Sequence, residues 1–187
     1  MADALMPCFS AGQYEKEGAI IGHLLVGYGE LELEMTACVG NAIKSSDDAL
    51  KAVFGVRGEA RRIKLAKANL RLPSKSAKLE PRTAQVLADM EWCKEIRNQY
   101  AHCQWYPTNG LGFINLEEVA LVIGPLGQLE KYRHDVHLPL LVSQEEFFGY
   151  VKKCFWHLAE QYQNWATQSS SNTFPMPQAT ARPPKYI

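Results

Sequence analysis

The chain lacks the cysteine pattern of a disulfide-stabilised protein. Its five cysteines are odd in number and scattered along 187 residues, and none belongs to a Cys-x-x-Cys pair. Disulfide frameworks of small secreted proteins usually contain an even number of cysteines at characteristic spacings. We therefore expect free thiols and a reducing, cytoplasmic location.

Long apolar runs and secretion signals are also missing. No uncharged apolar stretch approaches the roughly 18 residues that a membrane-spanning helix needs. The N-terminus has no basic segment leading into an apolar one, as a signal peptide would. We expect a soluble intracellular protein with no membrane partner.

Motifs for nucleotides and metals are absent as well. Gly55-x-x-Gly58 is followed by no Lys-Ser/Thr pair, so it is not a phosphate-binding P-loop. His134 and His137 are three residues apart, as are Cys154 and His157, but neither pair has the spacing of a zinc module. We expect no metal and no cofactor.

Net charge is zero, because 20 basic residues balance 20 acidic ones, so overall charge favours no class of partner. The charges are nevertheless segregated along the chain. Residues 57–79 contain eight basic residues and one acidic residue, whereas residues 1–50 contain eight acidic and two basic ones.

The basic segment predicts a surface that faces RNA phosphates. The candidate contacts are Arg57, Arg61, Arg62, Lys64 and Lys67. The same charges are also expected if this segment packs beside the acidic first helix or is simply solvated, and the sequence leaves both alternatives open.

Apolar residues that recur every three or four positions predict an all-α fold of four to five helices. The first helix begins near Glu15, and its apolar repeat includes Leu31 and Met35. Ser45-Ser46-Asp47-Asp48 is a good N-cap region for the second helix, Pro73 is expected to end the third, and Ser143 is expected to cap the last. Helices are expected over about 15–42, 49–54, 59–70, 80–105 and 143–165.

A small hairpin is expected after the fourth helix. Asn109-Gly110 is a strong two-residue turn signal between Gln104–Tyr106 and Gly112–Leu116. The hairpin opens an irregular insertion, about 105–142, with a short helix near 128–134. Trp105 and Tyr106 are candidates for stacking on RNA bases, although they also fit as core residues at the end of the bundle.

The domain prediction divides the chain into three parts. Residues 1–14 form a leader, residues 15–166 form the helical domain, and residues 167–187 form a flexible tail rich in serine and proline. A protein that recruits a partner through this tail is one of the functions that the sequence leaves open.

Three residues near the end of the fourth helix are candidates for catalysis. At about 100° per residue, Arg97 falls on the same stripe as apolar neighbours, where an arginine must snorkel, find a partner or face an interface. Asn98 and His102 are four residues apart and share the flank of that stripe.

This trio suits RNA cleavage by attack of a 2′-hydroxyl on the adjacent phosphate. Histidine transfers protons near neutral pH, arginine binds a phosphoryl group whose negative charge grows, and asparagine holds an oxygen or fixes a tautomer. The residues alone also allow a structural role, in which Arg97 pairs with Glu30 or Glu34 and His102 is a surface histidine.

The pattern Arg97-Asn98-x-x-x-His102 resembles the signature of HEPN domains. The resemblance implies an antiparallel helical bundle that dimerises through the motif helices. It implies a metal-independent endoribonuclease with Arg97, Asn98 and His102 at a composite site, in the manner of a toxin or defence protein with a neutralising partner. The tyrosine that neutralisation usually involves is replaced by Gln104. A non-catalytic HEPN-like module that binds nucleotide or RNA, or that acts as a dimeric scaffold, is the alternative.

Overall fold

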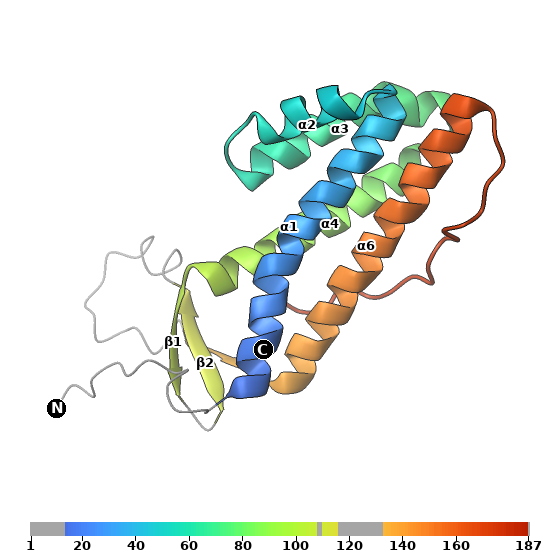
Figure 1. Cartoon of the computed structure of the whole chain (residues 1–187). Coiled ribbons are helices and arrows are strands. Elements are labelled where there is room, and N and C mark those ends of the chain that lie inside the picture. Colours follow the sequence, from blue (N-terminus) through green and yellow to red (C-terminus); the bar gives the residue numbers. More distant parts are fainter. Residues whose placement is uncertain (1–13, 108–109, 116–132, 187) are drawn as a thin grey trace. The chain divides into compact units, whose positions relative to one another are not determined.

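Helices dominate the structure, a computed structural model that describes residues 14–107, 110–115 and 133–186 (Figure 1). The all-α prediction is confirmed, with one small sheet. The predicted leader, apart from Tyr14, and most of the short helix near 128–134 lie outside the described residues. The elements are α1 (Glu15–Ile43), α2 (Ser46–Phe54), α3 (Glu59–Ser76), α4 (Glu80–Ala101), β1 (Cys103–Pro107), β2 (Leu111–Asn115), β3 (Arg133–Val136) and α6 (Leu138–Thr167).

The chain divides into two compact units, and α1, α4 and α6 contribute residues to both. One, called the sheet unit here, consists of Met1–Val26, Glu95–Glu146 and Pro183–Ile187. The other, called the helix unit, consists of Gly27–Lys94 and Phe147–Arg182 and contains α2 and α3.

The core of the helix unit follows the predicted apolar repeats. Leu31, Met35 and Val39 of α1 are almost completely buried, as are Met90 of α4 and Phe155 of α6. Side chains three and four residues apart lie on one face of a helix, so each helix turns one apolar stripe inward. This burial is the main source of stability for the unit.

The boundaries of α2 and α3 show one success and one error of the sequence prediction. Ser45 is the N-cap of α2, and its hydroxyl accepts the Asp48 N–H at 3.3 Å. Pro73, however, lies inside α3 and does not end it. Proline removes only one backbone donor, and one further turn forms because the Ala77 N–H reaches the Pro73 carbonyl at 2.8 Å.

In the sheet unit, β1, β2 and β3 form an antiparallel sheet in that order. The predicted hairpin of β1 and β2 is confirmed. The helix before it ends at Ala101, not near residue 105, because Cys103 pairs with Asn115 and Trp105 with Phe113 in the hairpin. The third strand was not predicted, and Arg133 and His134 belong to it rather than to a helix.

The last helix begins at Leu138, five residues before the predicted cap at Ser143. The His137 carbonyl accepts the Leu140 N–H at 2.9 Å and so starts the first turn. Pro139 fits there because N–H groups in the first turn of a helix have no intrahelical acceptor, so the missing N–H of proline costs no hydrogen bond. Ser143 lies within the helix, and its hydroxyl donates a hydrogen bond to the Leu140 carbonyl at 2.7 Å.

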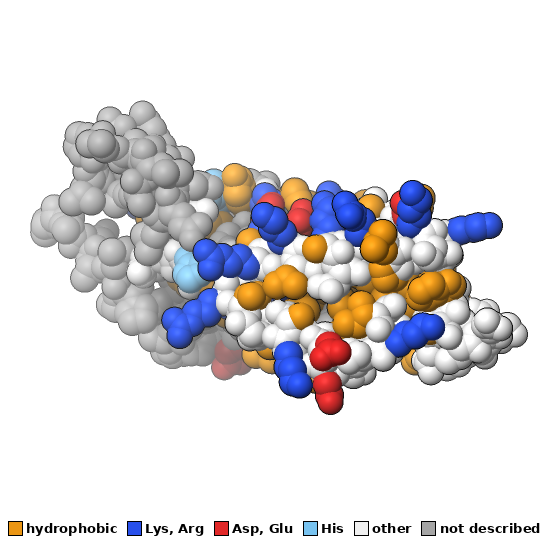
Figure 2. All heavy atoms as spheres, turned by 90° about the horizontal axis from the view of Figure 1, so that it is seen from above, with side chains coloured by type: hydrophobic (Ala, Val, Ile, Leu, Met, Phe, Trp, Pro, Cys, Tyr) orange, Lys and Arg blue, Asp and Glu red, His pale blue; other side chains and the backbone are white. Residues whose placement is uncertain are grey.

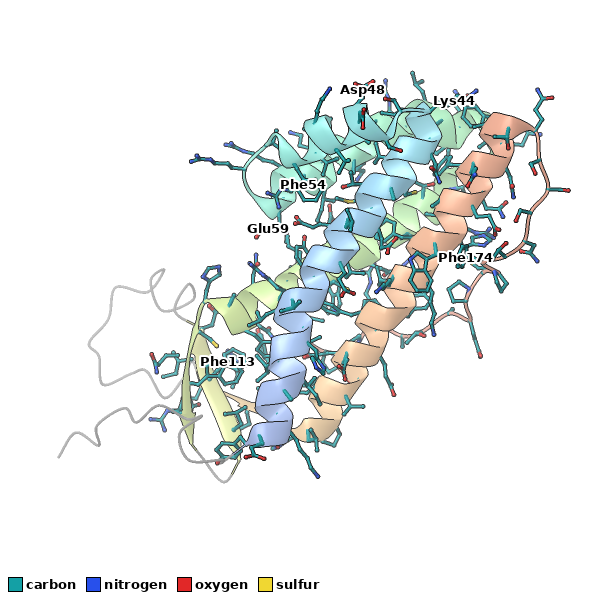
Figure 3. The ribbon with its side chains drawn as sticks, viewed as in Figure 1. Lys44, Asp48, Phe54, Glu59, Phe113 and Phe174 are labelled. Atoms are coloured by element: carbon teal, nitrogen blue, oxygen red, sulfur yellow. The ribbon has the colours of Figure 1, made fainter. Side chains whose placement is uncertain are left out.

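The described segment after α6 has no helix or strand, and several of its residues contact the helix unit. In the helix unit, one Glu160 oxygen accepts the Ser171 hydroxyl at 2.7 Å and the Thr173 N–H at 2.6 Å. Phe174, labelled in Figure 3, lies against the Trp156 ring, with centroids 5.7 Å apart. Composition reports low helix propensity, but it carries no information about these distant partners.

Within the described ranges, none of the helices combines the length and the apolar character needed to cross a membrane.

Candidate functional site

Arg97 and Asn98 meet on the last two turns of α4. Arg97 Nη1 donates a hydrogen bond to Asn98 Oδ1 at 3.0 Å, and both side chains are half-buried. This bond orients the guanidinium and leaves the amide group of Asn98 free for a further donor role. The structure thus brings together two of the three predicted catalytic residues.

His102 is the first residue after α4, not a member of the helix as predicted. Its backbone N–H donates to the Asn98 carbonyl at 3.0 Å, which closes the final turn and keeps the two residues adjacent along the helix axis. The imidazole is exposed and makes no hydrogen bond to any residue within the described ranges. It is therefore accessible to water or to a bound molecule.

Buried amides fix the backbone of this turn. Gln99 Nε2 donates to the Lys185 carbonyl at 2.6 Å, and the Tyr100 hydroxyl donates to Gln144 Oε1 at 2.6 Å. Gln144 Nε2 in turn donates to the Pro184 carbonyl at 2.8 Å. Lys185 also forms an ion pair with Glu95. The end of the chain is thus bound to the same turn that carries Arg97 and Asn98.

Sequence analysis did not find these supporting residues. Gln99 lies within the motif, but glutamine is common on exposed helix faces, and nothing local marks this one as buried. Gln144 is completely buried, which only the packing around it reveals.

Cys103 follows the histidine directly but is no candidate nucleophile. Burial raises the pKa of its thiol to about 12, and Sγ lies 3.5 Å from the Tyr100 carbonyl oxygen. A thiol with so high a pKa carries almost no thiolate near neutral pH.

The sequence also allowed a structural role in which Arg97 pairs with Glu30 or Glu34 of α1. In the helix unit, Glu30 accepts a hydrogen bond from Lys152 Nζ at 2.7 Å, and this bond lowers the pKa of Glu30. Glu30 thus has a partner of its own, on α6.

The two aromatic candidates have different surroundings. Trp105 is half-buried and stacks on Tyr100, with ring centroids 5.5 Å apart. Tyr106 is 6% exposed, and the Arg133 guanidinium lies 4.9 Å from its ring centroid. Of the two alternatives that the sequence left open for Tyr106, its burial fits a core residue of the sheet unit and not a ring exposed to RNA bases.

The basic candidates belong to the helix unit. Arg62 is already engaged, since Nη1 donates to Glu32 Oε2 at 2.7 Å and Nε donates to the Val56 carbonyl at 3.3 Å. Basic α3 and acidic α1 thus pair at this position, as the structural alternative predicted. The remaining four candidates are exposed: Arg57, Arg61, Lys64 and Lys67. Figure 2 looks onto the face of the helix unit that carries α2 and α3, where Lys and Arg side chains lie around exposed apolar ones.

Comparison of the chain with protein-family models, with curated proteins and with solved structures finds no match.

The described part of the chain has no group of three or more His, Cys, Asp or Glu residues placed to hold a metal ion. In the helix unit, both ring nitrogens of His157 have protein partners. Nδ1 donates to the Phe174 carbonyl at 2.8 Å, so Nε2 accepts from Arg82 Nη1 at 2.7 Å.

Proposed function

We propose that this protein is a metal-independent endoribonuclease of HEPN type. The observation that supports it is the arrangement at the end of α4, where Arg97 is bonded to Asn98 and an exposed His102 follows one turn later. The sequence resemblance supplies the reaction class. The helical bundle is consistent with the family, although many unrelated proteins share that architecture.

In the proposed reaction, a ribose 2′-hydroxyl attacks the adjacent phosphorus. The hydroxyl loses its proton to a base, the bond from phosphorus to the 5′-oxygen breaks, and that oxygen takes up a proton from an acid. The products are a 2′,3′-cyclic phosphate and a 5′-hydroxyl. Arg97 stabilises the charge that grows on the phosphoryl oxygens, and Asn98 orients the guanidinium.

A single imidazole does not serve as base and acid in the same step. We therefore propose a homodimer in which two copies of the α4 end face each other and two His102 side chains flank one phosphodiester. A neutralising partner, if one exists, would act by covering this exposed turn.

RNA outside the reacting bond would be bound through exposed cations. Arg57 and Arg61 are the best candidates, since both are exposed and neither side chain pairs with a described residue. Contacts of this kind bind phosphates without reading sequence, and they weaken as salt concentration rises.

The test is cleavage of an end-labelled single-stranded RNA in EDTA. We expect 2′,3′-cyclic phosphate ends, a loss of at least about a hundredfold for His102→Ala and Arg97→Ala, and a smaller loss for Asn98→Ala. His137→Ala is the matched control, because His137 is an exposed histidine of the same unit outside the motif.

Three outcomes separate the alternatives. Cleavage that requires a metal ion would rule out the proposed mechanism. RNA binding without cleavage, retained by His102→Ala and lost by Arg97→Ala, would show the non-catalytic binding module instead. If the protein neither binds nor cleaves RNA, the ribonuclease proposal has no support.

A further inference from the structure

A groove runs between α3 and α4 within the helix unit. Its volume is about 350 Å³, and its floor includes the side chains of Ala68, Ala84 and Leu87. Lys64, Lys67 and Arg71 line it from α3. Ala68 and Ala84 are exposed although they are apolar, because their short side chains leave the space between the two helices unfilled.

The three cations form a line on one face of α3. Spacings of three and four residues put them on consecutive turns, and seven residues of helix span roughly 10 Å. All three are exposed, and their side chains form no hydrogen bond or ion pair with any residue that the structure describes. Arg62, in contrast, is neutralised by Glu32. Glu80 is the acidic residue that also lines the groove, so the lining is net positive.

The polar groups in the floor are already satisfied. The Ser74 hydroxyl donates to the Arg71 carbonyl at 3.1 Å, and the Thr83 hydroxyl shares a hydrogen bond of 2.7 Å with the Tyr162 hydroxyl. Among the residues that the structure describes, no aromatic side chain lines the groove. The floor therefore provides van der Waals contact and burial of apolar surface, but neither a stacking platform nor a hydrogen-bonding pattern for a base.

We infer that this groove binds an acidic amphipathic helix of a partner protein. Such a helix would lay its apolar face on Ala68, Ala84 and Leu87, and its carboxylates, three and four residues apart along one flank, would meet the three cations of α3. The roughly 10 Å of the cationic line matches two turns of helix. Charge complementarity selects this partner over a neutral or basic one.

This inference changes the role of Lys64 and Lys67, which the sequence predicts as RNA contacts. Phosphates would satisfy the cations but would leave the apolar floor in contact with water. A peptide helix with carboxylates beside an apolar face uses both features of the groove. The groove uses none of the motif residues, so binding here is independent of the proposed ribonuclease activity.

The experiment selects ligands from a displayed library of helical peptides about 16 residues long, a length of roughly 24 Å. We expect enriched peptides to carry Asp or Glu beside an apolar stripe. Fluorescence anisotropy with one enriched peptide should then show at least about tenfold weaker binding to Ala84→Trp, which fills the groove without changing charge. Ala60→Trp is the control, because Ala60 is an exposed alanine of α3 outside the groove.

The contribution of charge is tested by a triple reversal. K64E/K67E/R71E should abolish peptide binding, whereas K51E/R57E/R61E, which changes net charge equally outside the groove, should reduce it only slightly. His102→Ala should bind the peptide as the wild type does.

Two results would overturn the inference. The first is a failure of the peptide selection: either the library yields no acidic amphipathic consensus, or the enriched peptides bind Ala84→Trp as tightly as the wild type. The other is a single-stranded RNA oligonucleotide that competes fully with the peptide and binds equally well to Ala84→Trp. That second result would identify the cations as a phosphate surface.

Discussion

Gln99 of the proposed catalytic turn donates a hydrogen bond of 2.6 Å to the carbonyl of Lys185, close to the C-terminus. Gln144, which is completely buried, donates to the carbonyls of Pro184 and Lys185 at 2.8 and 3.1 Å and accepts from the Tyr100 hydroxyl. In the sheet unit, residues far apart in the chain thus fix one turn of α4.

Gln144→Leu removes this junction. The Tyr100 hydroxyl and the Pro184 carbonyl lose their hydrogen bonds to Gln144, and the Lys185 carbonyl keeps only the one from Gln99. We expect a loss of about 2 kcal/mol in the free energy of unfolding, typical of buried polar groups left unsatisfied. Urea unfolding measures it, with Gln163→Leu, an exposed glutamine of α6, as the control. RNA cleavage by the proposed site should also fall, because the turn that carries Arg97 becomes less ordered.

Glu160 makes the attachment of the C-terminal segment dependent on pH. The hydrogen bond from Ser171, followed by those from the Phe174 and Thr173 amides, lowers the pKa of Glu160 to about 2. A lowered pKa means that the ionised form stabilises the folded state. This stabilisation is complete above pH of about 4.5 and is lost as the pH falls toward 2.

Glu160→Gln should therefore melt at a lower temperature than the wild type at pH 7, and the difference should shrink to nothing near pH 2. Thermal unfolding at a series of pH values measures this, with Glu91→Gln, at an exposed position of α4, as the control. A difference between Glu160→Gln and the wild type that stays constant with pH would contradict the assignment of the carboxylate.

Arg182 compensates the buried carboxylate of Asp89. Its Nε donates to Asp89 Oδ1 at 2.7 Å, and its guanidinium lies 5.7 Å from the Trp92 ring centroid. Asp89 is 2% exposed, and Gln85 also donates to it. Arg182→Met should therefore cost about 1–3 kcal/mol, because it leaves a buried charge with one neutral donor.

The double variant D89N/R182M should recover part of this loss, since the uncompensated charge is gone. Urea unfolding of the four proteins in the cycle measures the coupling. Equal losses for Arg182→Met with and without Asp89→Asn would show that the arginine acts through its packing alone.

Gly112 of β2 lies opposite Tyr106 of β1 and allows its ring to approach the backbone. A Cβ at residue 112 would lie 2.9 Å from Cζ of that ring. Because the ring is buried beneath Arg133, we expect Gly112→Ala to cost about 1–3 kcal/mol by overpacking.

The clash is tested by repeating Gly112→Ala in a Tyr106→Ala background, where it should cost clearly less. Gly149→Ala is the control. Gly149 is an exposed glycine of α6, and a Cβ there would meet no heavy atom within 4 Å, so alanine should stabilise by about 0.5–1 kcal/mol. Destabilisation that persists without the Tyr106 ring would place the cause in the backbone.

The sequence alone determined the features that depend on neighbouring residues. The apolar repeat through Leu31 and Met35 predicted α1, Ser45-Ser46-Asp47-Asp48 predicted the N-cap region of α2, and Asn109-Gly110 predicted the hairpin. Each of these signals acts within a few positions, because helix capping, helical periodicity and tight turns are local interactions.

Only the tertiary structure decided which residues are buried or bonded across long stretches of chain. In the folded protein, Tyr106 is buried in the core and Arg62 pairs with Glu32. A serine- and proline-rich segment is hydrogen-bonded to Glu160. The partners in the last two cases are 30 and 13 residues apart. Their pairing depends on how helices pack against each other and against the following segment, and no local pattern encodes that packing.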